Sequence, residues 1–426
     1  MRTLLTVLLL LQGLMAAAQA TFKAIDTTTS CAPVLYNEYS EKFKSFNKEI
    51  VTETAKQRSL TKEIYSEIQE DFLQKINSHN FICDNEINPY LQGLMKEVLT
   101  ANGIKPAGYR MLLSRDSEIN AYNTGDGTIV VHYGLFLAVD SEDELVSVIA
   151  HEIGHQFLEH VKKDIEGFAR HSTSEEVVKQ TREIRRQKYG KATMANNLLK
   201  RIRYQSYDER RKKEIEADSI GFAFYKKTGR DPRAAVSLLQ KFDAADKEQD
   251  SLTIADYKLI FEKNGFVVKQ KYFEQEQSLF TKYDKNKRID VDSLKTHPDC
   301  ATRIKLIEAH ITEGLSGKAS NSGTFAEIKK NSAYQSLINM YSEKEYGMSL
   351  YEALKYYKER PDDAILKNII YINLEKIQAA RANYTINRYV PAHDNLYNTA
   401  SLNRFISFLN NIRMADYDLL KNNFKS

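Results

Sequence analysis

The stretch Glu144–His160, ELVSVIAHEIGHQFLEH, places two histidines and a glutamate inside a run that is otherwise apolar. Its apolar residues recur at helical spacing, which predicts a buried helix. Polar rings are costly in such a place unless a partner satisfies them. Because His151 and His155 are four residues apart, a helix would stack them one turn apart on the same face. There the two rings could hold a single metal ion.

Glu152 follows the first histidine and would lie beside such an ion rather than over it. That position suits a carboxylate that takes a proton from metal-activated water, and H-E-x-x-H on a helix is typical of metalloproteases. The alternative is a helix with two core or surface histidines. A surface helix would not have the mainly apolar run LVSVIA directly before the first histidine. Two buried histidines without partners would cost folding free energy.

A catalytic zinc ion takes three protein ligands and keeps one position open, so a third ligand should lie on a neighbouring helix. The stretch KEIEADSIGFAFY, residues 213–225, offers two carboxylates four residues apart, Glu214 and Asp218. Glu214 could bind the metal while Asp218 orients a ligating histidine. Glu216 points elsewhere on the same helix and is the weaker candidate. This spacing of acidic residues is common on solvated helices, so by itself it is weak evidence for a metal site.

The composition narrows the function classes. The chain has 426 residues, enough for two or three structural units, and its 61 basic and 57 acidic residues leave a net charge of only +4. With both signs interspersed, nucleic acid is excluded as an expected partner.

The first residues, MRTLLTVLLLLQGLMAAAQA, read as a secretory signal peptide over residues 1–20. An early arginine, an apolar run and a final A-x-A cleavage pattern favour removal over an uncleaved anchor. No later run reaches the roughly 20 apolar residues that a spanning helix needs. We expect the mature chain to have no transmembrane span. We also expect it to be exported, to the periplasm if the host is a Gram-negative bacterium and otherwise out of the cell.

Three cysteines are too few for a disulfide scaffold, but an oxidising compartment would allow one bridge. We expect it to join Cys31 to Cys83, which leaves Cys300 over.

Residues 21–83 predict an N-terminal arm of one or two amphipathic helices. A helix over INPYLQGLMKEVLTANGI should stop at Asn102-Gly103, and strands are predicted in YRMLL and TIVVHY. Ser141 or Asp140 can cap the helix with the H-E-x-x-H pattern, and Glu144 could complete a capping box. The charged residues from 160 to about 213 read as a solvated helical hairpin.

Residues 320–426 predict a polar helical domain. Within it SLYEALKYYKERPDDAILKN resembles one tetratricopeptide-type unit. A repeat array would need about three such units, so a generic helical subdomain stays an equal alternative.

Four stretches in order resemble one family. They are INAYNTGDGTIVVHYGLF, ELVSVIAHEIGH, EIEADSIG and THPDCATRI, spread between about Asn88 and Glu308. Together they resemble the zinc metallopeptidase family that includes HtpX, the CAAX prenyl endopeptidase and the soluble periplasmic BepA-like proteases. The resemblance implies an α+β, mainly α fold with a zincin-like core and a small edge-exposed sheet over residues 84–313.

By this resemblance one Zn²⁺ per chain would be held by His151, His155 and Glu214, with Glu152 as the general base and Asp218 behind the ligands. Asn120 and Ala121 would lie on an edge strand that a peptide substrate joins by strand addition.

Two further residues come from the last stretch. His297 would approach the zinc ion or plug the cleft, and Arg303 would lie near the site. A loop histidine and a surface arginine are the alternatives for these two residues.

The function expected is zinc-dependent hydrolysis of internal peptide bonds in exported proteins that are misfolded or unassembled. The alternative is an autoinhibited, chaperone-like module that binds unfolded clients with little proteolysis. A purely structural zinc site is disfavoured, because such sites close all four positions with cysteine and histidine and Cys300 is the one thiol near these motifs in sequence. The oligomeric state is left open.

Overall fold

The computed structural model describes residues 22–25, 31–186, 191–245, 251–274, 300–311, 321–395 and 398–425. The predicted signal peptide and the candidate His297 lie outside these residues. Within them the chain is mainly helical with one small sheet, so the prediction of an α+β fold dominated by helices is confirmed.

Helices supply most of the described chain. In the first part they are α2 (Ala32–Glu49), α3 (Ala55–Asn77), α4 (Ile87–Ala101), α5 (Leu135–Ala138), α6 (Glu142–Phe157), α7 (His160–Ser172), α8 (Glu175–Arg186), α9 (Lys191–Lys226) and α10 (Arg233–Ala245). In the second part they are α11 (Ile254–Phe261), η1 (Gln270–Phe273), α12 (Cys300–Glu308), α13 (Gly323–Ser342), α14 (Tyr346–Glu359), α15 (Ala364–Ala382), η4 (Ile386–Arg388), α16 (Ala400–Asn411) and α17 (Met414–Asn422).

The sheet has four strands in the order β1-β2-β4-β3. Its central pair, β2 (Arg110–Ser114) and β4 (Thr128–His132), is parallel and matches the two strands predicted from the sequence. The flanking strands β1 (Phe81–Ile82) and β3 (Ala121–Asn123) are antiparallel to their neighbours. Because β3 is the last strand in this order, one edge of the sheet ends at it.

The three middle residues of each central strand are apolar because helices cover both faces of the sheet. Met111, Leu113, Ile129 and Val131 point into the main core with α4 and α6. Leu112 and Val130, which alternate with them, point into a second layer formed by the N-terminal arm. Side chains that alternate between two covered faces give a continuous apolar run.

The predicted N-terminal arm is a hairpin of α2 and α3. Thr54 caps α3 with a reciprocal capping box to Gln57. The arm packs on the sheet through aromatic rings of both helices, including Tyr39 and Phe72, whose centroids lie 4.8 Å apart. The predicted disulfide Cys31–Cys83 is present and ties the start of α2 to the end of β1, with the two Cα atoms 6.1 Å apart.

Helix α6 contains most of the stretch Glu144–His160 and ends at Phe157. Ser141 is its N-cap and accepts a hydrogen bond from the Glu144 amide at 3.2 Å. The predicted capping box is only half formed, because the Glu144 carboxylate accepts from the Asp140 amide and from Lys241 instead. Lys241 lies on α10, so Glu144 fixes the start of α6 to a neighbouring helix rather than to its own cap.

The C-terminal helices form a separate apolar core, built from α14, α15, α16 and α17. The unit predicted to resemble a tetratricopeptide repeat is the helical hairpin α14–α15. Residues 252–272, on α11 and η1, also pack in this second core, although the predicted division places them in the domain 84–313. Conversely, Phe325 and Ile328 at the start of α13 pack in the main core. The chain therefore runs back and forth between its two cores, and the predicted boundaries stay a prediction.

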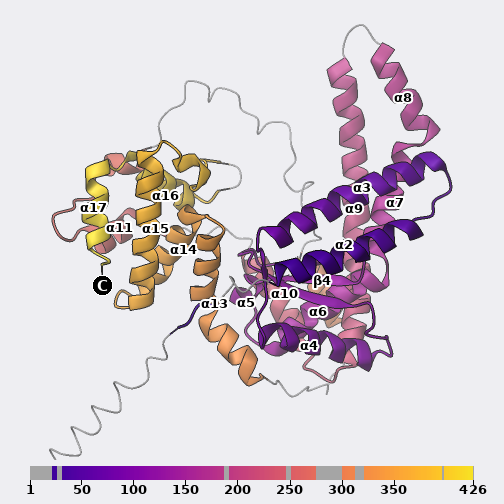
Figure 1. Ribbon diagram of the computed structural model, residues 1–426, viewed down its shortest axis with the longest axis horizontal. Coiled ribbons are helices and arrows are strands. Elements are labelled where there is room, and N and C mark those ends of the chain that lie inside the picture. The colour runs from indigo at the N-terminus through magenta and orange to yellow at the C-terminus, as the bar shows by residue number, and fades with distance from the viewer. Residues whose placement is uncertain are drawn as a thin grey trace, which may run out of the picture.

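Figure 1 shows the two cores as separate bodies, with α13 running between them. In the same view α8 and the adjoining part of α9 form a hairpin that projects from the main body. None of the described helices combines the length and the apolar character that crossing a bilayer requires.

Candidate metal centre and substrate cleft

The candidate metal centre lies where helices α6 and α9 cross at close range. A Cβ atom on Gly154 would lie 2.9 Å from the Ala217 carbonyl oxygen, and one on Gly221 would lie 2.8 Å from the His151 Cα. Since real side chains do not approach so closely, only glycine fits at these two positions. The two glycines let the helix backbones touch, and this brings Glu214 on α9 up to the histidines of α6.

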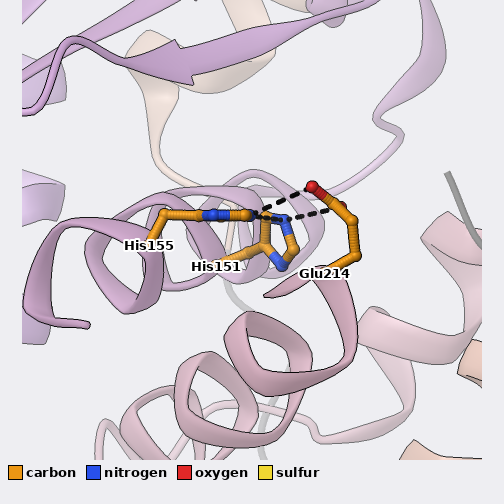
Figure 2. A group of neighbouring side chains, drawn as sticks. All are labelled: His151, His155 and Glu214. Atoms are coloured by element: carbon orange, nitrogen blue, oxygen red, sulfur yellow. Dashed lines mark hydrogen bonds and ion pairs between the residues drawn. The ribbon is translucent and has the colours of Figure 1, made fainter. Parts of the chain in front are cut away.

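His151, His155 and Glu214 converge as the sequence predicts, with one ligand-type atom of each within 4.8 Å of the others. The two Nε2 atoms are 3.0 Å apart, and Glu214 oxygens lie 3.6 Å from His151 Nε2 and 3.4 Å from His155 Nε2. Figure 2 shows both rings turned toward the carboxylate. Ligand atoms about 2.0–2.1 Å from a tetrahedral zinc ion are about 3.3 Å from one another. The observed separations are close to this value, so the three residues fit a zinc ion.

Asp218 and Arg303 lie behind His151. Asp218 Oδ1 is 3.0 Å from His151 Nδ1, the ring nitrogen that faces away from the ligand group. Arg303 donates two hydrogen bonds to the same carboxylate, at 2.6 and 2.7 Å. Arg303 is buried, which rules out the surface arginine considered from the sequence. These contacts give both residues the geometry of positioning groups, since neither is among the three converging ligands.

Electrostatics at the centre favour a cation. Burial alone would disfavour a charged His151 ring, but hydrogen bonds to Asp218 and Glu214 raise the pKa of His151 to about 10. The pKa of His155 falls to about 3 through burial and the neighbouring His151. Although burial opposes it, the Arg303 hydrogen bond lowers the pKa of Asp218 to about 2. Asp218 and Glu214 thus stabilise positive charge on the His151 ring, one at each of its two nitrogens.

Glu152 is buried and lines the same cavity as the three candidate ligands. Burial raises its pKa to about 7, an effect partly offset by the nearby His151 and by hydrogen bonds from Asn123. A carboxylate whose pKa lies near neutrality can both take and return a proton at ordinary pH. This is the chemistry that the sequence assigns to Glu152.

Asn120 and Ala121 lie at the start of the edge strand, as the resemblance implies. The Asn120 carbonyl oxygen accepts from the His132 amide at 3.0 Å, and Ala121 pairs with Val131. Both residues line the cavity, which has a volume of about 670 Å³. Apolar side chains of α6, α9, α10 and α12 also line it, namely Val148, Phe222, Leu238, Leu239, Phe242 and Ile307. The cleft therefore offers both a strand edge and an apolar surface.

Two residues with a place at this site, Asn123 and His160, were missed by the sequence reasoning. Asn123, at the end of β3, reaches Glu152. His160 contacts His155, and Glu216, which the sequence made the weaker candidate, contacts His160. His160 is the last residue of the quoted stretch, but its approach to His155 depends on a turn that spacing alone does not reveal. His297 lies outside the described residues.

Comparisons with known proteins agree with this geometry. Residues 85–311, more than half of the chain, match the model of peptidase family M48. A beta-barrel assembly-enhancing protease of Escherichia coli is 31% identical over 163 residues, 38% of this chain and 33% of the relative. A protein of the same name from Yersinia pestis is 26% identical over 285 residues, 66% of this chain and 54% of the relative. The mitochondrial metalloendopeptidase OMA1 of Schizosaccharomyces pombe is 26% identical over 157 residues, 37% of this chain and 44% of the relative. The chain matches less than two thirds of the length of each of these relatives.

Proposed function

The chain belongs to peptidase family M48, and from this premise we propose that it is a zinc-dependent endopeptidase that hydrolyses internal peptide bonds of exported proteins. The observation that carries the proposal is the convergence of His151, His155 and Glu214 beside the buried Glu152. In this proposal the three converging residues hold one zinc ion. When bound, zinc supplies Lewis-acid chemistry, which polarises a carbonyl and makes water acidic.

The chain's own residues carry the proton and place the substrate. Glu152 takes the proton from the attacking water and returns it to the nitrogen of the leaving amine. Asn123 holds the Glu152 carboxylate through its hydrogen bonds. Asp218 Oδ1, 3.0 Å from His151 Nδ1, favours the ring hydrogen on that nitrogen and so leaves the Nε2 lone pair for the metal.

The edge strand β3 supports binding of an extended peptide. Its open edge lines the cavity beside the candidate ligands, so a substrate backbone can add there as a further strand. The same cavity is lined by apolar side chains, so it could also accept apolar side chains of a bound peptide. Folded proteins rarely offer an extended segment with apolar side chains, which favours misfolded or unassembled clients. The names of the bacterial relatives, which refer to assembly of beta-barrels, are in line with such a role.

The test is digestion of an unfolded reference protein by the purified chain that begins after residue 20, together with its metal content. We expect one zinc ion per chain, peptide products in its presence and loss of activity with a chelator. Glu152→Gln should keep the zinc ion and lose cleavage by at least about 1,000-fold, the scale expected when a positioned proton carrier is removed. Glu175→Gln, at an exposed position on α8, is the matched control and should cleave normally.

Two outcomes would refute the proposal. One is full cleavage by Glu152→Gln, and the other is a chain that folds but binds no zinc. Binding of the unfolded protein without products would favour the chaperone-like alternative.

A further inference from the structure

His155 has a second histidine behind it. Its Nδ1 atom lies 2.9 Å from Nδ1 of His160, while its Nε2 atom faces His151 and Glu214. His160 is 2% exposed. The two rings meet nearly edge to face, with their centroids 4.9 Å apart. A buried ring with this geometry makes a directed contact between two nitrogens rather than a loose apolar one.

The backbone between the two histidines turns sharply to allow this contact. Helix α6 ends at Phe157, and α7 begins at His160. Between them Glu159 has φ 54°, in the left-handed region that residues other than glycine rarely adopt. A conformation of this kind is kept only where surrounding contacts outweigh its cost of about 1 kcal/mol or more. Here the turn folds α7 back so that its first residue reaches the α6 ring.

Glu216 on α9 completes a chain of contacts. Its Oε2 atom lies 3.1 Å from His160 Nε2. A carboxylate at this distance accepts a hydrogen bond from the ring, so His160 carries its hydrogen on Nε2 and leaves Nδ1 as an acceptor. His155 Nδ1 must then be the donor in the contact between the rings. The His155 Nε2 atom therefore keeps its lone pair, and this atom is the one that faces the candidate metal position.

We propose that His160 and Glu216 are positioning residues for the metal centre, which fix the tautomer and the orientation of His155. The inference rests on the proposed function, since it requires that His155 binds zinc. His155 would thus be held much as Asp218 holds His151 from the other side. The two supports differ in one respect, because the Asp218 side chain is 5% exposed and that of Glu216 is 61% exposed. Glu216 should therefore contribute less than His160, since water can replace it.

The experiment measures zinc affinity of the purified chain by competition with a chromophoric chelator, and needs no substrate. His160→Phe keeps an aromatic ring but removes both nitrogens, and we expect zinc affinity to fall by about 10-fold to 100-fold. His160→Asn offers an acceptor oxygen near the place of Nδ1, so it should recover most of this loss. Glu216→Gln should weaken binding by only a few-fold.

His132→Phe is the matched control, because His132 is also a buried histidine, 6% exposed, but lies on β4 away from the candidate ligands. It should lower stability without changing zinc affinity. A long-range ¹⁵N–¹H spectrum of the metal-free wild type should show the hydrogen of His155 on Nδ1, and His160→Phe should lose this preference. This signature reports the tautomer, which a merely structural role of His160 would not determine.

The inference is overturned if folded His160→Phe binds zinc as tightly as the wild type, or if the spectrum places the His155 hydrogen on Nε2. If His160→Phe does not fold, the same spectrum is recorded for His160→Asn and Glu216→Gln. Comparison of these spectra with that of the wild type then tests the role of the two residues. A wild type that binds no zinc would instead refute the proposed function, so the two failures are distinguishable.

Discussion

Arg303 forms a two-point ion pair with Asp218, 85 residues away, through hydrogen bonds of 2.6 and 2.7 Å. Both side chains are buried, and Asp218 in turn contacts His151. A carboxylate buried this deeply needs a fixed cation, because an uncompensated charge in such a place is very costly. The pair therefore links α12 to the metal centre.

Removing the guanidinium should leave the buried Asp218 carboxylate without its arginine partner. We expect Arg303→Leu to lower the free energy of unfolding by about 3 kcal/mol or more, measured by urea denaturation in excess chelator. Adding Asp218→Asn to this variant should cost less than Asp218→Asn costs alone, by at least about 1 kcal/mol. If the two substitutions lower the free energy of unfolding additively in this double-mutant cycle, Arg303 and Asp218 do not interact directly.

The close approach of α6 and α9 at Gly221 gives a second prediction. A methyl group there would lie 2.8 Å from the His151 Cα, so Gly221→Ala must push the two helices apart. We expect a loss of about 1–3 kcal/mol in stability and a weaker zinc affinity, because Glu214 lies on the helix that moves. Gly167→Ala on α7 is the control, since a Cβ there meets nothing within 4 Å. That variant should be stabilised by up to about 1 kcal/mol. Equal stability and equal zinc affinity of the Gly221→Ala and Gly167→Ala variants would argue against the close contact of α6 and α9.

The disulfide Cys31–Cys83 should stabilise the arm on the sheet. It closes a loop with a sequence separation of 52, and in the chain-entropy account a bridge of this span contributes about 4 kcal/mol. The double variant Cys31→Ser, Cys83→Ser should show this loss in urea denaturation and no further change when a reductant is added. Cys300→Ser should keep the full response to reductant. An unchanged midpoint for the reduced wild type would show that the bridge does not contribute.

Glu343, at the end of α13, predicts a pH dependence of stability. Burial raises its pKa, and Arg115 offsets this only in part. A carboxyl whose pKa is raised on folding holds its proton better in the folded state, so its contribution is favourable below its ordinary pKa. The contribution falls as pH rises through the interval up to the raised value.

Glu343→Gln removes this titration and should therefore be more stable than the wild type at pH 7, by less than about 1 kcal/mol, with the difference gone at pH 4. Thermal denaturation at the two pH values measures the effect. Glu327→Gln, 66% exposed on the same helix, should show no such difference. A gain for Glu343→Gln at pH 4 that equals the gain at pH 7 would contradict the assignment to this carboxyl.

Local features of the sequence predicted local features of the structure. The strands β2 and β4, the helix α4 with its stop at Asn102, and the N-cap Ser141 each follow from a pattern of a few neighbouring residues. The same holds for His151 and His155, because helical spacing alone places them on one face. The bond between Cys31 and Cys83 was predicted from composition and compartment, and the structure contains it.

The sequence alone therefore predicts the H-E-x-x-H helix, the strands beside it and, with the family resemblance, the candidate ligand Glu214. Only the tertiary structure decided how distant segments meet. Arg303 is buried because α12 packs beside α9, and α11 joins the C-terminal core across 100 residues or more of sequence. His160 reaches His155 through the left-handed turn at Glu159. Periodicity encodes which face of an element is buried, whereas the partner of that face depends on packing among elements far apart in the chain.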